Sequence, residues 1–490
     1  MLKNQLGNGM DTFAQDLFLH VEVSHPLLSE ILAGDYRLDA CYYSKRANRA
    51  RESFAEASLP SIPISSIADV FALSDFSLFR IPAANEKLGV PFYTFSDIEE
   101  FNPQPTMFLS KRLEPNLDDY LVQKGWVLIS RAGTIGKVVL VGAELHGKAV
   151  SNHAIRIIPR DSEMGALIYT ALSGELGRDI VKSCMYGSVV DVIKPFQINS
   201  IKIPLPPKKV VNLLSSKVQE ALSARSSARN LLHEAEGIIY EINGLPRLKT
   251  EDLKFLNNLF EVETFETSSK IIWQLNSEGS EYRMEAHFYN PLAQLAVKNL
   301  KPCRSEVKPL HEVTERIILG PRFKRNYVEA DHGLPFLSGR NIVQIRPELK
   351  YLSNVQVADM QELIIKEGWT LVTCSGTIGR TCFVWRNYED YAASQHILRV
   401  VPDTGKIDPG YLYAFLSSRY GYEQILRYRY GSVIDEITDK QIGKVLIPLP
   451  SKKDQKLIGE KVRLAYEKRA EALHLEDEAQ EILMKELTIT

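Results

Sequence analysis

The sequence contains one unit twice, and this repeat constrains the fold more than any other feature. Residues 186–193, Tyr-Gly-Ser-Val-Val-Asp-Val-Ile, return at 430–437 as Tyr-Gly-Ser-Val-Ile-Asp-Glu-Ile, and 430 − 186 = 244. Further matches on both sides keep offsets between 243 and 246, which single-residue insertions explain. The repeat predicts two domains of one fold, because each copy is long enough to bury its own core.

Glycines and prolines mark the best-kept positions of the repeat. Gly-Thr-Ile-Gly at 133–136 returns at 376–379, and Ile-Pro-Leu-Pro at 203–206 returns at 447–450. Glycine adopts positive φ readily, so we predict a hairpin turn at each Gly-Thr-Ile-Gly segment. The residues that we assign to this structural frame are Gly133, Gly136, Gly187, Ser188, Gly376, Gly379, Gly431 and Ser432.

Each copy has the pattern of a mixed α/β (α+β) domain. A helix is expected over 166–180, and its counterpart in the second copy over 409–426. Short apolar segments bounded by turn residues are typical of β-strands. In the first copy these segments are 127–130, 138–141, 155–159 and 201–204.

A long helix is predicted after each copy, because apolar residues recur there alternately four and three positions apart, as in a coiled-coil seam. Glu476 interrupts the second of these stripes. Each helix of about 35 residues would be about 50 Å long. Neither can bury its stripe alone, so we expect the two to pack antiparallel. The seam positions are Leu214, Val218, Ala221, Arg225, Ala228, Leu232, Ala235, Ile239 and Ile242 in the first helix and Ile458, Val462, Ala465, Arg469, Ala472, Ala479 and Leu483 in the second.

Composition excludes several classes of protein. With 44% hydrophobic and 24% charged residues the chain is an ordinary globular one. No apolar run approaches the roughly 20 residues that span a bilayer, and the first residues lack the apolar core of a signal peptide, so a cytoplasmic location is expected. The five cysteines form no Cys-x-x-Cys pair, which argues against disulfides and zinc. The net charge of −2 requires any DNA-binding surface to be local.

No catalytic or metal-binding constellation emerges. The segment 133–137 has two residues between its glycines instead of the four of a phosphate-binding loop, and Val138 follows its lysine. His153 and His396 follow a serine by two positions, but no acid recurs beside them to complete a triad. Asn290-Pro291 is followed by leucine and so lacks the Asn/Asp-Pro-Pro-aromatic motif of amino-methyltransferases. We expect neither catalytic residues nor a bound metal.

Basic residues occur beside aromatic ones at several places in both copies, and arginine and lysine are the residues that bind DNA phosphates and guanine edges. Two further basic residues follow the glycine turns. The candidate DNA-binding residues are Arg46, Arg49, Arg51, Lys137, Arg322, Lys324, Arg325, Arg380, Arg427 and Arg429.

Nearly the whole chain resembles the specificity subunits of type I restriction-modification systems. The resemblance lies in the order and spacing of Gly187-Ser188, Gln197-Ile198 and Ile-Pro-Leu-Pro, which recur as Gly431-Ser432, Gln441-Ile442 and Ile-Pro-Leu-Pro before a long helix. It implies two tandem mixed α/β target recognition domains separated by two long helices that pack as an antiparallel coiled coil. The expected division is 1–206 (first target recognition domain with an N-terminal lead-in), 207–243 (central helix), 244–281 (linker), 282–450 (second domain) and 451–487 (C-terminal helix).

The resemblance also implies a function without catalysis by this chain. Such a subunit reads a bipartite site in double-stranded DNA and is bound by two methyltransferase subunits and, where present, restriction subunits. S-adenosylmethionine, Mg²⁺ and ATP would belong to these partners and not to this chain. The location would be the prokaryotic cytoplasm, at the nucleoid through DNA.

The repeat itself suggests where a target would be read. If the copies read different half-sites, residues identical in both must be scaffold, phosphate contacts or partner contacts. Reading is then expected where the copies diverge, which is roughly 44–88 against 290–332, 99–107 against 342–350, and 172–185 against 415–429.

Three alternatives remain open at this point. A type IIB enzyme has a recognition subunit of similar design. A tandem-repeat protein interaction scaffold would use the long helices as its working surface and would not bind DNA. An enzyme with a site between the two copies would involve His153 or His396.

Overall fold

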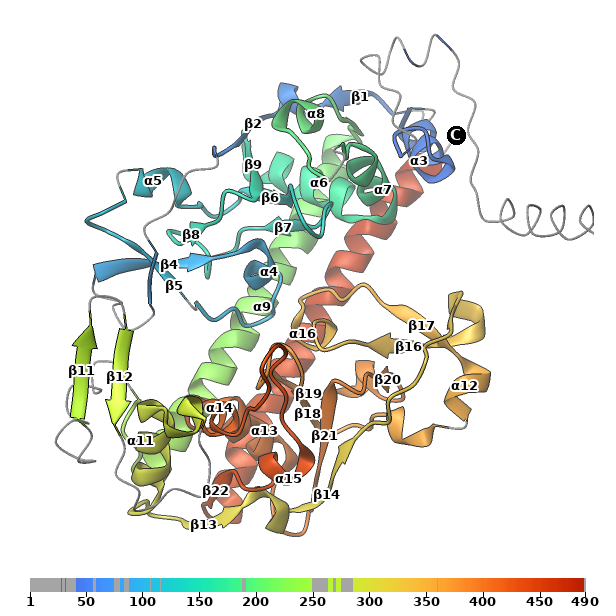
Figure 1. Cartoon of the computed structure of the whole chain (residues 1–490). Coiled ribbons are helices and arrows are strands. Elements are labelled where there is room, and N and C mark those ends of the chain that lie inside the picture. The colour runs from blue at the N-terminus through green and yellow to red at the C-terminus, as the bar shows by residue number, and fades with distance from the viewer. Residues whose placement is uncertain are drawn as a thin grey trace, which may run out of the picture. The chain divides into compact units, whose positions relative to one another are not determined.

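The computed structural model describes residues 28, 31, 41–55, 59–74, 80–82, 88–105, 107–114, 116–186, 191–248, 263–267, 270–274, 285–358 and 360–488. The chain forms two compact units, each a mixture of helices and short strands (Figure 1). Unit 1 consists of Met1–Ser77, Asp118–Glu220 and Leu475–Thr490, and unit 2 of Leu78–Leu117 and Ala221–His474. Within the part of the chain that the structure describes, three helices pass from one unit to the other: α5 (Leu117–Tyr120), α9 (Lys208–Asn243) and α16 (Lys452–Thr488).

The elements of unit 1 are α3 (Lys45–Ala55), β1 (Ser61–Pro63), β2 (Ala68–Ala72), β6 (Val127–Ser130), β7 (Val138–Leu140), β8 (Ala149–Val150), β9 (Ala154–Pro159), α6 (Ser162–Ser173), α7 (Glu175–Ser183), α8 (Pro195–Asn199) and β10 (Lys202–Pro204). An antiparallel sheet has the strand order β2-β9-β6-β7, and β1 pairs with β10. The residues of β6 are all buried, with α6 packed against the sheet, and the first three of them are apolar in succession instead of alternating.

The elements of unit 2 before the second copy are β3 (Arg80–Pro82), β4 (Gly89–Tyr93), α4 (Phe95–Ile98), β5 (Met107–Ser110), β11 (Glu263–Thr267) and β12 (Lys270–Gln274). The second copy contributes α11 (Pro291–Leu300), β13 (Glu306–Pro309), β14 (Thr314–Leu319), β15 (Tyr327–Val328), β16 (Gly333–Leu337), β17 (Lys350–Ser353), α12 (Asn354–Ala358), β18 (Thr370–Thr373), β19 (Thr381–Phe383), β20 (Ala392–Ala393), β21 (Ile397–Pro402), α13 (Pro409–Ser417), α14 (Arg419–Arg427), α15 (Asp439–Ile442) and β22 (Leu446–Leu449).

The sheets confirm that both copies have one fold. The order β14-β21-β18-β19 in unit 2 repeats the order β2-β9-β6-β7 in unit 1, and the pair β13-β22 repeats the pair β1-β10. Within unit 2, β15-β17-β16 likewise repeats β3-β5-β4. The mixed α/β fold that the sequence predicts is therefore present in both copies.

A buried arginine lies at the same position of both copies. Arg156 in β9 and Arg399 in β21 have no exposed surface, and 399 − 156 = 243. Arg156 donates to the carbonyls of Ala154 and Val150, at 3.1 and 2.7 Å, and Arg399 donates to the carbonyl of Ile397 at 2.6 Å. Such bonds stabilise backbone groups that would otherwise be buried without partners. A single charge within each apolar strand was the sequence signal for this feature.

The helix predicted over 166–180 is in fact two helices, as is its counterpart in the second copy. α6 ends at Ser173 and α7 begins at Glu175, while α13 and α14 are separated at Ser418. The break brings each second helix close to the end of the first. A Cβ at Gly177 would lie 1.9 Å from the Ala171 carbonyl oxygen, so only glycine fits at this contact.

The long helices bury the predicted stripes. The predicted seam residues are buried except Leu232 and Ile242, which are half-buried. The buried ones include Leu214, Val218 and Arg225 of α9 and Ile458, Val462, Arg469 and Leu483 of α16. Glu476 does not break the second stripe as expected, because its side chain is also buried and accepts a hydrogen bond of 2.5 Å from the Tyr169 hydroxyl.

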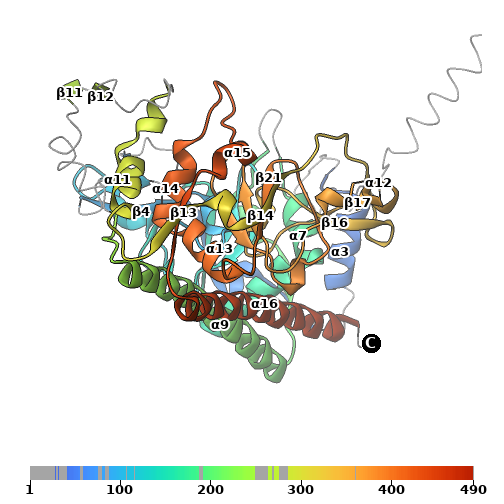
Figure 2. The same cartoon turned by 90° about the horizontal axis from the view of Figure 1, so that it is seen from below.

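Two ion pairs define the direction of the helix pair α9 and α16, whose ribbons are drawn in Figure 1 and, from below, in Figure 2. Lys217 pairs with Glu478 at 2.8 Å in unit 1, and Lys461 pairs with Glu234 at 2.6 Å in unit 2. The residue numbers give 217 + 478 = 234 + 461 = 695, so the helices are antiparallel in one register. The two pairs are also equivalent in the repeat, since both members differ by 244. The predicted antiparallel arrangement is confirmed. None of the helices that the structure describes is long and apolar enough to cross a membrane.

Candidate DNA interface

Both copies place the same glycine turn beside the central strands of their sheets. Gly133 and Gly136 have φ values of 76° and 83°, and Gly376 and Gly379 have φ values of 74° and 83°. These left-handed conformations are strained for other residues, which accounts for the glycines. In both turns a hydroxyl side chain before the turn accepts from the backbone N–H of the basic residue after it, at 2.9 and 3.0 Å. The backbone at this place is therefore the same in the two copies.

The basic residues that follow these turns are held inside the protein. Lys137 is only 8% exposed. Arg380 is half-buried and lies 3.3 Å from Glu100, which is itself largely buried. Neither side chain projects toward solvent as a phosphate contact would, so a structural role suits both better than the DNA contact that the sequence suggested.

In unit 2, a cluster of basic and polar side chains surrounds the turn at 376–379. Arg322 is strongly exposed, at 83% of its side chain, and lies 3.4 Å from Glu436. Glu436 forms a β-bridge with Ser375, which precedes the turn, and accepts from the Tyr430 hydroxyl at 3.4 Å. Three segments that are distant in the sequence thus meet at one surface.

Arg325 extends this cluster. Its guanidinium donates to the Gln395 side-chain carbonyl at 3.0 Å and lies over the Phe336 ring at 5.3 Å. The Gln395 amide lies 3.1 Å from Nε2 of His396. Burial and the nearby positive charge of Arg325 lower the pKa of His396, which favours a neutral ring. The cluster therefore presents arginine, amide and imidazole groups together.

Two further candidates lie at the edge of this cluster. Lys324 is exposed, and its backbone carbonyl accepts from Gln356 at 2.6 Å. Arg429 is partly exposed and lies 3.4 Å from Asp435. We call the group of Arg322, Lys324, Arg325, Gln395, His396, Arg429 and Glu436 the basic cluster of unit 2.

Unit 1 has the same frame with different side chains. The bridges of Ala132 and Tyr186 with Val192 repeat those of Ser375 and Tyr430 with Glu436. The backbone is therefore paired in the same way in both copies, but at this half-buried position unit 1 has valine and unit 2 has glutamate. Three further positions diverge in the same way: Arg131 corresponds to Cys374, Ala132 to Ser375 and Asn152 to Gln395. Gly187 and Ser188 lie outside the described residues, whereas Gly431 has a φ of 123° and Ser432 is exposed.

The arginines of α3 divide into two groups. Arg46 and Arg49 are exposed, so both remain candidates for DNA contact. Arg51 instead bridges α3 to α7, because it donates to the Ser183 hydroxyl at 3.0 Å and lies 4.2 Å from the centre of the Tyr42 ring. It also donates to the Tyr42 carbonyl.

Arg427 makes the equivalent contact with an aromatic ring in unit 2. It lies on α14, is 9% exposed, sits 4.0 Å from the centre of the Phe288 ring and donates to the Phe288 carbonyl at 3.2 Å. Tyr42 and Phe288 are repeat counterparts, as are Ser183 and Arg427. A guanidinium thus covers the same aromatic position in both copies although it comes from a different helix. This packing explains Arg51 and Arg427 without DNA.

The hairpin loop after Tyr430 exposes apolar side chains. Tyr430 and Glu436 pair at its base, and at its tip Val433 is 93% exposed and Ile434 is 58% exposed. The sequence at this tip is nearly identical in the first copy. Exposed apolar residues at a kept position are typical of a contact with another protein.

A pairing that sequence reasoning missed joins segments from the two copies inside unit 2. Phe101 N–H donates to the Val343 carbonyl and Ile345 N–H to the Glu99 carbonyl, both at 2.7 Å. The central residue, Glu100, forms a bridge with Gln344. These residues begin two divergent stretches that were expected to read DNA, and their packing gives them a structural role.

The seam arginine of α16 supports this pairing. Arg469 donates to the Gln344 carbonyl at 2.7 Å and lies 4.7 Å from the centre of the Phe101 ring. Arg340 forms an ion pair of 2.5 Å with Glu99. Among the described residues, no group of histidine, cysteine, aspartate and glutamate is arranged to hold a metal ion.

A model of one protein family matches both copies of the repeat. Residues 64–222 and 304–468 match the type I restriction modification DNA specificity domain. The S subunit of a type I restriction-modification system from M. genitalium is similar in structure, with 13% identity, 88% of this chain and 96% of that chain covered, and a TM-score of 0.34. The HsdS subunit from Thermoanaerobacter tengcongensis has 13% identity, the same coverage of 88% and 96%, and a TM-score of 0.27. No curated protein matches the sequence significantly.

Proposed function

This chain belongs to the type I restriction-modification DNA specificity family, and we propose that it reads a split DNA target and docks the methyltransferase subunits that modify it. The family match covers both copies of the repeat and more than half of the chain. Two copies of one recognition fold supply two reading surfaces, and the bipartite target follows from them.

One observation carries this proposal: the copies keep the backbone around the glycine turn but change the side chains on it. Glu436 stands where unit 1 has Val192, and Gln395 where it has Asn152. A scaffold alone gives no reason for such divergence, whereas two surfaces that read different half-sites require it.

The basic cluster is the proposed reading surface of unit 2. Arginine recognises guanine through two hydrogen bonds in the major groove, and glutamine recognises adenine in the same way. Arg322, Arg325 and Gln395 supply these groups on neighbouring segments. In unit 1, the exposed Arg46 and Arg49 of α3 supply positive charge for the phosphate backbone.

The exposed loop tip is the proposed docking surface for a methyltransferase subunit. Residues kept in both copies serve as scaffold, phosphate contacts or partner contacts. Val433 is too exposed to be scaffold, and its side chain has no group that binds phosphate. A contact with a partner subunit is the remaining role. Two copies of the loop would then dock two methyltransferase subunits.

Catalysis would belong to the partners. S-adenosylmethionine would be bound by the methyltransferase subunits, and Mg²⁺ and ATP by restriction subunits where these are present. The role of this chain is to place the partners at the target, which requires rigid reading surfaces and no reacting groups.

Methylation mapping tests the proposal directly. Host DNA is sequenced for modified bases with the intact gene, without it, and with Arg322→Ala plus Arg325→Ala. The intact chain should produce a modified motif of two separated parts, which disappears without the chain. The double variant should relax or lose one part only. A motif that persists without the chain, or a continuous motif, would contradict the proposal.

A further inference from the structure

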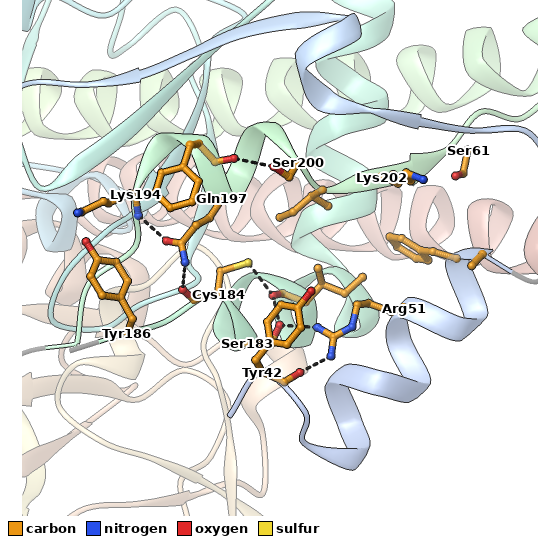
Figure 3. Close-up of a pocket in the computed structure, with 15 residues that line it drawn as sticks. Tyr42, Arg51, Ser61, Ser183, Cys184, Tyr186, Lys194, Gln197, Ser200 and Lys202 are labelled. Carbon is orange, nitrogen blue, oxygen red and sulfur yellow. Dashed lines mark hydrogen bonds between the residues drawn. The ribbon is translucent and has the colours of Figure 1, made fainter. Parts of the chain in front are cut away.

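Unit 1 contains a cavity of about 590 Å³ between α3, α7 and α8 (Figure 3). Its walls are largely apolar and include Phe54, Ile180, Phe196 and Ile201. The volume and the lining, apolar with a few polar groups, are those of small-molecule sites in other proteins. Neither the proposed reading surface nor the docking loop accounts for this cavity.

Comparison of the copies explains why the cavity exists. Ser183 and Cys184, which line it, correspond to Arg427 and Tyr428 in unit 2, at an offset of 244. There the Tyr428 ring packs edge-on against Phe288, with centroids 5.9 Å apart, and Arg427 covers the same ring. Unit 2 thus fills with the Tyr428 ring a space that unit 1 leaves open beside Tyr42, the counterpart of Phe288, whereas a guanidinium covers this aromatic position in both copies.

The charges around the cavity point to an anionic ligand. Lys194 and Lys202 are both exposed, and Figure 3 shows them at opposite ends of the cavity. Lys194 also lies over the Tyr186 ring, 5.1 Å from its centre. Among the described residues that line the cavity, none carries a carboxylate. A ligand that matches this arrangement has an aromatic centre and a negative group on either side.

We propose that the cavity binds a nucleoside that carries a phosphate on each side. The base takes the space that Tyr428 fills in unit 2 and lies against Tyr42, whose ring is held by the Arg51 guanidinium. The phosphates meet Lys194 at one end and Lys202 at the other. Bases stack readily on aromatic side chains whatever their identity, and lysine ammonium groups bind phosphate.

A polar network fixes the shape of this site. Gln197 accepts from the backbone N–H of Lys194 at 2.8 Å and donates to the Cys184 carbonyl at 2.7 Å. The amide therefore ties the lysine at one end of the cavity to the wall that Cys184 forms. The site is organised before a ligand arrives, which lowers the entropic cost of binding.

The ligand chemistry has two sources, a free nucleoside bisphosphate or a nucleotide within a DNA strand, which has a phosphate on both its 5′ and 3′ sides. Calorimetry on the full chain distinguishes them. The probes are the 3′,5′-bisphosphates of thymidine and deoxyadenosine, the matching 5′-monophosphates, the nucleosides, inorganic phosphate and a short single-stranded oligonucleotide. A bisphosphate should bind about tenfold more tightly than the monophosphate, because it gains a second charge-assisted contact. Tighter binding of the oligonucleotide than of the bisphosphate identifies the strand as the source, and the reverse identifies the free compound.

Variants tie the binding to the cavity. Cys184→Tyr introduces the residue of unit 2 and should abolish binding by filling the space. Because a bulky change can disturb folding, Lys194→Ala and Lys202→Ala provide a second test at exposed residues. Each of these substitutions should lower the affinity for the bisphosphate by about tenfold. Lys208→Ala is the matched control, since Lys208 is 80% exposed and does not line the cavity.

Two results would overturn the inference. The first is that neither a bisphosphate nor the oligonucleotide shows binding that Lys194→Ala or Lys202→Ala weakens. The second is that inorganic phosphate or the nucleoside alone binds as tightly as the bisphosphate, which would leave one half of the proposed ligand without a role.

Discussion

Glu100 and Gln344 occupy the same position of the repeat and pair with each other in unit 2. Gln344 is buried and Glu100 is largely buried, and the glutamate is the one ionisable member of a contact that is otherwise symmetric. Burial raises the pKa of Glu100 to about 7, and this effect outweighs Arg380 and Arg340, which lower it. At neutral pH this carboxyl group is thus close to its titration midpoint.

The raised pKa predicts a specific pH dependence of stability. Between the unfolded pKa of 4.5 and the folded pKa of about 7, the folded chain binds a proton that the unfolded chain does not. Stability from this group is therefore present at low pH and is lost as the pH rises through about 7. Glu100→Gln, which installs the residue of the other copy, should gain up to about 3 kcal/mol relative to wild type between pH 5 and pH 8. Denaturant unfolding at several pH values measures this difference, with the exposed Glu481→Gln as control. A difference that is constant with pH would contradict the prediction.

A second prediction concerns the exposed tip of the hairpin loop. Val433→Asp should weaken association with the methyltransferase subunit by at least tenfold, because a charge would be desolvated in an apolar contact. The free chain should unfold at the same denaturant concentration as wild type, since Val433 is 93% exposed. Co-purification and light scattering report the association, and Val355→Asp, at an 80% exposed residue outside the loop, is the control. Equal association of both variants would remove the loop from the interface.

Individual arginines show where a sequence pattern leaves more than one role open. Sequence proximity to aromatic residues made Arg51 and Arg427 DNA candidates, yet both guanidinium groups cover a ring inside their own unit. An arginine beside an aromatic residue has the same sequence pattern whether the ring belongs to a packed core or to a DNA-facing surface. Only the three-dimensional contact, which here joins Arg51 of α3 to Tyr42 and Arg427 of α14 to Phe288, separates the two.

At the scale of elements, the long helices were the most predictable feature. Their apolar periodicity fixes the buried face, and the glycine after Asn243 ends α9 with a φ of 65°. Glu476 was expected to interrupt the buried stripe because a carboxylate is polar. It is nevertheless buried in the seam, where its carboxylate accepts a hydrogen bond from the Tyr169 hydroxyl. The break between α6 and α7 was missed for a similar reason, since the close contact at Gly177 is tertiary and leaves no local signal beyond the glycine.

The helix pair predicts a ruler for the DNA spacer. The unit boundary crosses α9 after Glu220 and α16 after His474, and 220 + 475 gives the same 695 that the ion pairs give. Seven residues inserted at both points would keep the seam in phase and lengthen each helix by about 10 Å, or about three base pairs. The methylated motif should then have a spacer about three base pairs longer, with both half-sites unchanged. Insertion into α9 alone is the control, because it displaces Lys217 from Glu478 and should abolish methylation. An unchanged spacer after the double insertion would reject the ruler.

At the scale of the whole molecule, the net charge is close to zero, so any positively charged surface must be local. The chain has 59 basic and 61 acidic residues, so long-range attraction to DNA is absent and binding must come from local groups. Exposed basic groups nevertheless occur on both units, where they include Arg46, Arg49 and Arg322. Sequence composition alone could not reveal which arginines are exposed, because it averages over the whole chain.

Salt dependence distinguishes the two kinds of basic residue. Arg46→Ala with Arg49→Ala should weaken binding to all sequences alike and reduce the slope of log affinity against log salt by about two, because two phosphate contacts are lost. Arg322→Ala with Arg325→Ala should instead cost about 1–3 kcal/mol per contacted base at one half-site and leave the other half-site unaffected. Fluorescence anisotropy with the methylated target and with a scrambled duplex measures both effects over a salt series. If both double variants lowered affinity for the two duplexes equally, the basic cluster would be a phosphate contact, and base reading would have to lie elsewhere in unit 2.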